Sequence, residues 1–371
     1  MKQRRLLLLI SVTLIGAWTL MAQSNKIKVA LFQGHGGSET CVWETQAALE
    51  MDRAIEADII TTSGMTSEHL GQYDVVVIPG GGGSRQYLNM GGQGREALRQ
   101  FVKNGGGVLG ICAGAYLITD TPNYACLSMS GAEAHDIEHD NRGRGISKVS
   151  LTDEGKALFP EIADRPLIYI MYYEGPVALQ SPKKDIIFTS LATMESDVHV
   201  EGNAPENMTN NKTFLYQSEY GKGKTMSVVG HPEATPGMQW MIARLVHQVS
   251  PKKVAEEVDP KFVDPDKFNE EILMTAERRK QESSSFDKFL YGSSDEKIEY
   301  LTWLIEHNSW DAKRWIQGLI HDSDPSVRKA TAELVGWAMY RMYLPDLKTA
   351  LSREDHPEVR KTLEEVIKGL E

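Results

Sequence analysis

Hydrophobic residues between positions 26 and 249 gather in short runs, and most of these runs end at glycine. The runs at 27–32, 74–78 and 107–111 are nearly continuous, which is typical of strands buried on both faces of a parallel sheet. Stretches with helical spacing alternate with them at 43–54, 94–103 and 238–249. The pattern predicts an α/β domain over residues 26–250, with a mostly parallel sheet and helices on both faces.

The middle of this domain is less regular. Ile59 and Ile60 mark a second strand, and further strands are predicted at 148–152, 167–173 and 186–191. Residues 195–212 are polar and predict a long loop or a hairpin tip. A last strand at 226–229 leads directly to His231.

The composition changes after Pro251, where glycine becomes scarce and charges become dense. Residues 251–285 are interpreted as a charged, partly helical linker. From 286 to 371 apolar residues recur at helical spacing, and a Pro-x-Val-Arg-Lys sequence beginning at Pro325 returns at Pro357. Such a repeat, with proline opening a helix, predicts a HEAT-like α-helical domain. A small irregular helical bundle is the alternative.

Residues 1–22 have a basic start, an apolar run from Leu6 to Met21 and the small residue Ala22. This is the pattern of a secretory signal peptide, so we expect a periplasmic or secreted protein without a membrane span after cleavage. The run is shorter than the ~20 apolar residues that cross a bilayer. An uncleaved membrane anchor is the alternative.

The chain is acidic, with a formal net charge of −11, and it has no basic run. This excludes a dedicated nucleic-acid binder, because an acidic surface repels phosphate backbones. Cys41, Cys112 and Cys126 are too few for a disulfide scaffold, and they form no CxxC or Cys/His cluster for structural zinc. One disulfide would leave one free thiol, for which we expect Cys112.

Cys112 lies at the centre of a Gly-x-Cys-x-Gly sequence, where a predicted strand turns sharply into a helix. This is the pattern of a nucleophile elbow, in which the flanking glycines relieve crowding and the strained central residue is exposed above the sheet. A helix that begins at Ala113 would also favour the thiolate. The alternative is a cysteine that merely fills space as a small apolar residue.

His231 follows the last strand and is separated from Glu233 by a single proline. In an extended segment, residues i and i+2 project to the same side, so Glu233 can orient the imidazole. Cys112, His231 and Glu233 would then supply nucleophile, general base and orienting carboxylate. A histidine that caps a helix at the domain surface is the alternative.

These two motifs resemble the class I glutamine amidotransferase-like superfamily, which has a flavodoxin-like fold and a Cys-His-Glu triad. Gly110–Tyr116, the Arg142-Gly143-Arg144-Gly145 stretch and Tyr172–Pro176 look more narrowly like the domain found at the amino terminus of eukaryotic-type biotin-protein ligases. The resemblance covers residues 26–250. It implies that the turn after the strand at 74–78, Gly81 and Gly82, forms an oxyanion hole with the amide of Ala113. A plain tight turn is the alternative.

Two departures limit this resemblance. Amidotransferases that feed ammonia to a synthetase usually have glutamine two positions beyond the second glycine of the elbow, where this chain has Tyr116. We therefore do not expect glutamine-dependent ammonia transfer, for which the chain also offers no second catalytic domain. The flanking sequence of a ligase catalytic domain is absent, so we do not expect a biotin ligase.

Several polar residues near the predicted carboxyl edge of the sheet are candidates for a substrate pocket: His35, Arg85, Tyr116 and Glu174. A second cluster, His135, Glu138, His139 and Asp140, has spacing that could suit a metal, but the surrounding glycines favour a polar loop. We expect neither a metal nor another cofactor.

Together these patterns predict an exported, Cys-dependent hydrolase or amidase that acts on a small amide or peptide. The alternative is a non-catalytic binding or scaffold protein whose helical tail docks a protein partner. Fold analogy does not decide between them, because function depends on the site.

Overall fold

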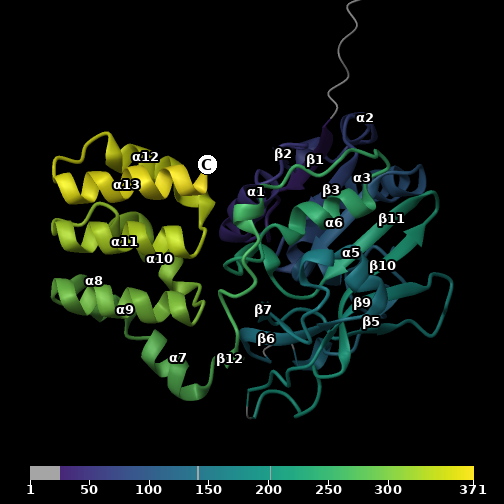
Figure 1. The fold of residues 1–371 in the computed structure, drawn as a ribbon. Coiled ribbons are helices and arrows are strands. Elements are labelled where there is room, and N and C mark those ends of the chain that lie inside the picture. The colour runs from purple at the N-terminus through teal and green to yellow at the C-terminus, as the bar shows by residue number, and fades with distance from the viewer. Residues whose placement is uncertain (1–25, 140–141, 201) are drawn as a thin grey trace, which may run out of the picture.

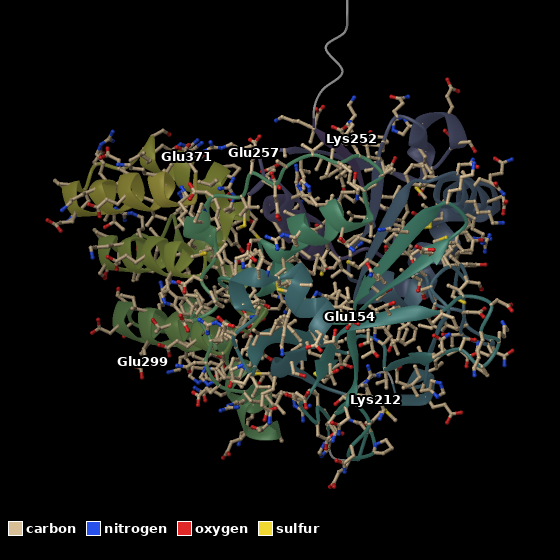
Figure 2. All side chains as sticks on the ribbon, turned by 45° about the vertical axis from the view of Figure 1, so that its right-hand side comes forward. Glu154, Lys212, Lys252, Glu257, Glu299 and Glu371 are labelled. Carbon is tan, nitrogen blue, oxygen red and sulfur yellow. The ribbon has the colours of Figure 1, made fainter. Side chains whose placement is uncertain are left out.

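The computed structural model describes residues 26–139, 142–200 and 202–371. The predicted signal segment 1–22 and Asp140 of the polar cluster lie outside these ranges. The chain forms an α/β domain and a separate stack of helices beside it (Figure 1). Within the described ranges, no helix combines the length and apolar character that a membrane span requires. Charged side chains such as Glu154 and Glu299 lie at the outer surface of the two regions (Figure 2).

Five strands of the sheet run parallel and form the half that carries the candidate site. Their order across the sheet is β2 (Ile55–Ile60), β1 (Ile27–Phe32), β3 (Val75–Ile78), β4 (Gly107–Ile111) and β11 (Gly223–Val228). Numbered along the chain within this half, that is the order 2-1-3-4-5 of flavodoxin-like folds. The predicted fold class is confirmed. The carboxyl ends of β3, β4 and β11 meet at one edge of the sheet.

The other half of the sheet is antiparallel, and the sequence only partly predicted it. Beyond β11 lie β10 (Lys212–Tyr220), β9 (Phe188–Met194), β6 (Arg144–Leu151) and β12 (Ile272–Leu273), while β7 (Ile168–Tyr173), β8 (Ala178–Gln180) and β5 (Ala132–Ala134) pair off this path. The strand β10 was not predicted. The strand β12 lies in the stretch interpreted as a linker and pairs with β6, so part of that stretch belongs to the sheet.

Helices cover both faces of the sheet, as predicted. Helices α1 (Glu39–Leu49) and α6 (Met241–Val249) pack on one face, and α2 (Ser67–Leu70), α3 (Gly83–Lys103) and α4 (Ala113–Leu117) on the other. The short α5 (Asp153–Leu158) packs against β9. Helix α3 starts at Gly83, well before the predicted residue 94. Gly91 interrupts it with a φ of 65°, which puts the apolar spacing of its two halves out of phase.

Short 3-10 turns complete the part of the chain that the structure describes: Thr62–Gly64, Ile137–His139, Pro160–Ile162, Pro232–Ala234, Pro260–Phe262 and Arg341–Tyr343. The turn Pro232–Ala234 matters most for the site, because it holds Glu233 directly beside His231.

The carboxyl-terminal region is all helical. It contains α7 (Ala276–Glu282), α8 (Ser285–Tyr291), α9 (Ser294–Glu306), α10 (Asp311–Leu319), α11 (Pro325–Trp337), α12 (Leu344–Leu351) and α13 (Pro357–Leu370). Helices α9, α11 and α13 stack in order around a core of their own (Figure 1). Val327 and Val359, at matching places of the sequence repeat, are both buried in it. The assignment of these helices to HEAT repeats stays a prediction.

The helical region packs directly on the α/β domain. Asn308 Nδ2 donates a hydrogen bond to the Ala234 carbonyl at 3.1 Å, and Gln239 Nε2 donates to the Ala338 carbonyl at 3.0 Å. Lys313 on α10 and Glu44 on α1 form an ion pair in which both side chains are buried. These contacts bring α10 to the carboxyl edge of the parallel strands, where the candidate site lies.

Candidate active site

Cys112 occupies the sharp turn between β4 and α4. Its φ of 50° and ψ of −104° are unusual for a residue with a side chain and match the strained centre of a nucleophile elbow. The flanking glycines are required by close approach: a Cβ on Gly110 would lie 2.5 Å from the Gly114 carbonyl oxygen, and one on Gly114 would lie 2.0 Å from that of Ile78. The backbone therefore has the strained geometry of the predicted elbow. The expectation that the side chain is exposed above the sheet is wrong, because the sulfur packs against the Tyr173 carbonyl and Cys112 is buried.

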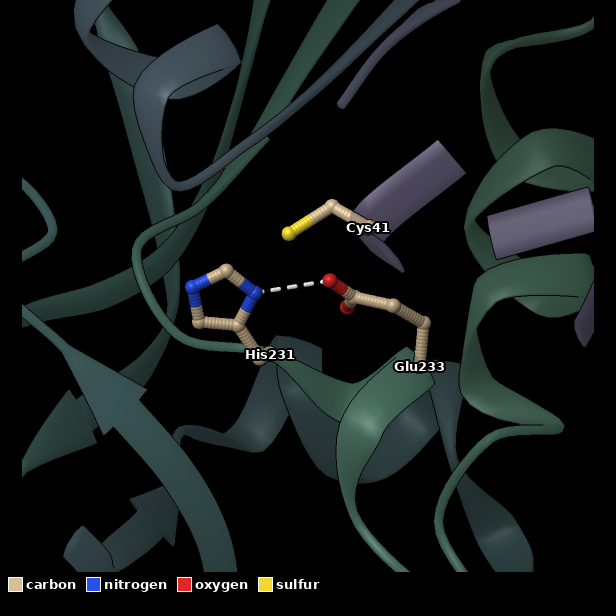
Figure 3. Close-up of side chains that lie close together, drawn as sticks. All are labelled: Cys41, His231 and Glu233. Atoms are coloured by element: carbon tan, nitrogen blue, oxygen red, sulfur yellow. Dashed lines mark hydrogen bonds and ion pairs between the residues drawn. The ribbon is translucent and has the colours of Figure 1, made fainter. Parts of the chain in front are cut away.

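His231 and Glu233 lie together at the end of β11. His231 Nδ1 and Glu233 Oε1 are 2.7 Å apart, and both side chains are buried (Figure 3). The amide of His231 donates to the Met171 carbonyl at 2.7 Å, which fixes the backbone of this turn. Because Glu233 occupies Nδ1, the imidazole has Nε2 left for a second partner. Cys112 also interacts with the imidazole and, together with Glu233, favours its protonated form.

The charges of the three groups support one another. Burial works against a charged imidazole, but the attraction of Cys112 and of Glu233 outweighs it and raises the pKa of His231 to about 10. The ring is therefore protonated at neutral pH. A protonated imidazole beside a sulfur favours the thiolate, which is the nucleophilic form of cysteine. The sulfur of Cys112 also lies 3.4 Å from the Tyr173 carbonyl oxygen, to which the neutral thiol donates.

Cys41 is a second thiol in this site, and no local motif predicted it there. It comes from α1, and its sulfur lies beside the His231 ring and Glu233 (Figure 3). Burial, together with the charges of Glu233 and Glu44, raises the pKa of Cys41 well above its usual range. Cys41 is thus a neutral thiol at neutral pH. All three cysteines of the chain are free, so Cys112 is a free thiol as expected and no disulfide joins Cys41 and Cys126.

Ligand-type atoms of Cys41, His231 and Glu233 lie within 4.8 Å of one another, a spacing that a metal ion could use. A metal would need the Cys41 thiolate and would have to displace Glu233 from the imidazole. The raised pKa of Cys41 opposes the first step, and the buried His231–Glu233 pair opposes the second. The arrangement therefore suits an oriented general base better than a metal centre.

A cavity of about 760 Å³ opens in front of Cys112 and His231, which is large enough for a short peptide or a substituted amide. Arg85, Tyr116 and Glu174, which were predicted for a substrate pocket, are among the residues that line this cavity. His35 does not: its side chain is exposed outside the cavity, and its amide donates to Asn89 Oδ1 at 2.6 Å. The turn after β1 pairs with the glycine turn after β3 through Gly37 and Gly81. The His35 side chain is exposed at the surface of this turn and does not reach the cavity.

The glycine turn after β3 lies beside the elbow and lines the cavity with Ala113. Gly81 has a φ of +135°, and a Cβ on it would lie 2.3 Å from the Gly36 carbonyl oxygen, so only glycine fits there. The amide of Gly82 already donates to the same carbonyl at 2.7 Å. Because its amide is already engaged, Gly82 does not donate to an oxyanion, and the prediction for this residue is wrong. The amides of Gly81 and Ala113 stay the predicted donors of the oxyanion hole.

Tyr116 belongs to a buried polar network behind the cavity. Its hydroxyl donates to Asp136, and Arg142 Nη1 pairs with the same carboxylate at 2.7 Å. Arg142 Nη2 also lies 2.6 Å from the Tyr172 hydroxyl, which in turn donates to the Gly175 carbonyl at 2.7 Å. The Arg142-Gly143-Arg144-Gly145 stretch therefore contributes a structural arginine to the fold.

The polar residues near position 135 differ in their exposure to solvent. His135 and Glu138 are exposed on the loop around Ile137–His139, whereas Asp136 is buried in the network with Arg142. The loop interpretation of this segment agrees with the exposed positions.

Helix α10 supplies a wall of the cavity that sequence reasoning missed. Trp310, at its N-terminal end, packs edge-to-face against His231 with ring centroids 4.7 Å apart. Lys313, Arg314 and Gln317 follow along the same wall. No local motif marks these residues, because the contact joins segments far apart in the sequence.

Comparisons with known proteins agree with this geometry. The family model described as "Biotin-protein ligase, N terminal" matches residues 27–133. The phosphoribosylformylglycinamidine synthase subunits PurQ of Lacticaseibacillus casei strain BL23 and of Lacticaseibacillus paracasei strain ATCC 334 are each 36% identical over 85 residues. Each match spans 22% of this chain and 36% of the relative, so the chain aligns with about a third of the length of these curated relatives. The matches to this family model and to the PurQ subunits support a class I glutamine amidotransferase-like fold for the α/β domain.

Solved structures of similar extent include PurLQS from Thermotoga maritima, at 13% identity and a TM-score of 0.43, with 60% of this chain and 97% of that chain covered. The cytoplasmic protein STM3548 from Salmonella typhimurium has 15% identity and a TM-score of 0.41, with 60% and 99% covered. In this chain the α/β domain is followed by a helical region whose helix α10 contributes to the same cavity.

Proposed function

We propose that this protein is a cysteine-dependent amide hydrolase that acts on a small amide or peptide. The observation that carries the proposal is the buried chain of contacts from Glu233 through His231 to Cys112, which opens into the cavity beside the glycine turn. A positioned nucleophile, a base and an orienting carboxylate are what acyl transfer through a covalent intermediate requires.

In the first half of the reaction, the Cys112 thiolate attacks the amide carbonyl carbon and a C–S bond forms. The negative charge that develops on the carbonyl oxygen is stabilised by the amides of Gly81 and Ala113. Protonated His231 then donates its proton to the amide nitrogen, the C–N bond breaks, and the amine leaves. The substrate's acyl group remains bound to Cys112 as a thioester.

In the second half, neutral His231 takes a proton from water, which attacks the thioester carbonyl. The C–S bond breaks, a carboxylic acid is released, and the Cys112 thiolate and protonated His231 are restored. Glu233 holds the ring orientation through both halves, since it stays on Nδ1.

Glutamine as the amide donor is a less favoured substrate, since Tyr116 occupies the place where ammonia-transferring relatives carry glutamine. The Tyr116 hydroxyl is bound to Asp136, which directs it into the protein rather than toward an amide in the cavity.

A screen of peptide amides, simple amides and glutamine tests both the hydrolase activity and its substrate preference. Turnover by the wild type and none by Cys112→Ser is the expected result. No turnover of any substrate, with equal binding by both proteins, would instead support a binding module.

Export belongs to the same proposal, since residues 1–22 have the pattern of a signal peptide. The mature protein recovered from a periplasmic fraction should begin after Ala22 when its amino terminus is sequenced. Recovery of the intact amino terminus in the cytoplasm would contradict export.

A protein partner would bind the outer faces of the helical region, because α10 already packs on the α/β domain.

A further inference from the structure

Three contacts from the helical region converge on the candidate triad. Trp310 packs on the ring of His231, Asn308 donates to the carbonyl of Ala234, and Lys313 pairs with Glu44. Ala234 directly follows Glu233 in the chain. The negative charge of Glu44 interacts unfavourably with a charged Cys41 thiolate and with the Glu233 carboxylate. Each contact therefore ends on the triad itself or on a residue next to it.

Trp310 packs against two residues, His231 and Tyr173, that both interact with Cys112. One is the His231 ring, which it meets at an interplanar angle of 86°. The other is Tyr173, whose ring centroid lies 5.2 Å from that of Trp310 and whose carbonyl accepts from the Cys112 thiol. An aromatic ring in such a position blocks rotation of the imidazole and keeps water from that side.

Trp310 is itself fixed by several partners. Its Nε1 donates to Glu44 Oε2 at 3.1 Å, and Lys313 Nζ lies 4.9 Å from its ring centroid. Glu44 and Lys313 are buried together, so neither charge is free to move away. Asn308 holds the start of this segment, with the Tyr340 hydroxyl 3.2 Å from its side-chain oxygen. The indole is therefore held against His231 from both regions of the protein.

We propose that helix α10 is part of the active site and that Trp310 is a positioning residue for His231. This inference rests on the proposed function of the triad. Without the indole, the imidazole can turn away from Cys112, and its favourable interaction with the sulfur weakens. Lys313, Arg314 and Gln317 then form the outer wall against which a substrate lies, so the hydrolase needs its helical region to be complete.

The test is the rate at which iodoacetamide alkylates Cys112, measured across a pH series in the full-length protein by mass spectrometry. Near pH 6, Trp310→Ala should slow the reaction by about tenfold, because fewer molecules carry the thiolate. At about pH 9.5 an ordinary thiol is also ionised, so the rates of variant and wild type should converge. Trp310→Phe keeps a ring against His231 and should stay within about twofold of the wild type.

Trp315→Ala is the matched control. Trp315 lies on the same helix but packs against Phe286 and Phe289 on α8, away from the cavity. Trp310→Leu is a second test variant that keeps an apolar side chain in the contact, and it should behave like Trp310→Ala. Circular dichroism melts establish that each variant is folded before its rate is compared.

The outcomes separate the two proposals. If Trp310→Ala and Trp310→Leu show the pH profile of Trp315→Ala while wild-type Cys112 remains highly reactive, the positioning role is wrong and the triad stands. If wild-type Cys112 reacts like a peptide thiol at every pH, the proposed hydrolase itself is wrong. A slowing of equal size at all pH values would indicate blocked access and would also overturn the positioning role.

Discussion

His231 and Trp310 pack edge-to-face, with ring centroids 4.7 Å apart, although one residue ends the parallel sheet and the other begins a helix of the carboxyl-terminal region. The contact joins the candidate triad of the α/β domain to a helical stack that has its own core. Stability and reactivity of the two regions should therefore depend on each other.

The buried pair of Lys313 and Glu44 should be a main source of this coupling. Replacing Lys313 by Met leaves a buried carboxylate without its cation, which should lower the free energy of unfolding by about 3 kcal/mol. Urea unfolding followed by circular dichroism measures this loss. The double variant Glu44→Gln with Lys313→Met removes both charges and should recover most of it. A double variant as unstable as the single one would show that packing, rather than charge, makes the contribution.

Acid should weaken the helical region through Glu354. Arg328 donates two hydrogen bonds of 2.7 Å to this carboxylate, and these lower its pKa from 4.5 to about 2. Since the folded pKa lies below the unfolded one, the unfolded chain takes up the proton first as the pH falls. The stabilisation is complete above about pH 4.5 and is lost as the pH falls toward 2.

Thermal melts of the full chain at a series of pH values test this assignment. Glu354→Gln should lower the melting temperature at neutral pH and flatten its decline below pH 4.5. Glu299→Gln, at an exposed position of α9, is the control and should leave the profile unchanged. An identical acid decline in wild type and Glu354→Gln would assign the decline to other carboxylates.

The two thiols of the cavity should react differently. Burial and neighbouring carboxylates raise the pKa of Cys41, whereas Cys112 faces a protonated imidazole. Peptide mapping after brief exposure to iodoacetamide at neutral pH should therefore find the label on Cys112 and almost none on Cys41. Cys41→Ser should leave the labelling rate of Cys112 within about twofold, as expected for a residue that is not the nucleophile. Preferential labelling of Cys41 would reverse the assignment.

The sequence predicted the parallel half of the fold well, because strands buried on both faces leave continuous apolar runs at residues 27–32, 74–78 and 107–111. The elbow at Cys112 and the pair His231 and Glu233 were also found, since each depends on residues adjacent in the chain. The antiparallel strand β10 was missed, and helix α3 was predicted to start too late, because Gly91 breaks the phase of its apolar face.

The contacts made by Cys41, Trp310 and Lys313 had no local signal. Each depends on tertiary packing that brings α1 or α10 to the edge of the sheet. The sequence suggested a polar linker between two independent regions, whereas the structure inserts β12 into the sheet and pairs Arg144 with Glu282 of α7. Long-range pairs of this kind do not appear as periodicity or as a short motif.

The most direct test of the account is the alkylation rate of Cys112 at about pH 6, compared between the wild type, His231→Gln and a model peptide thiol. Wild-type Cys112 should react at least about tenfold faster than the peptide, and His231→Gln should remove most of this advantage, because the protonated imidazole sustains the thiolate. Equal rates for all three would contradict the triad and, with it, the proposed hydrolase.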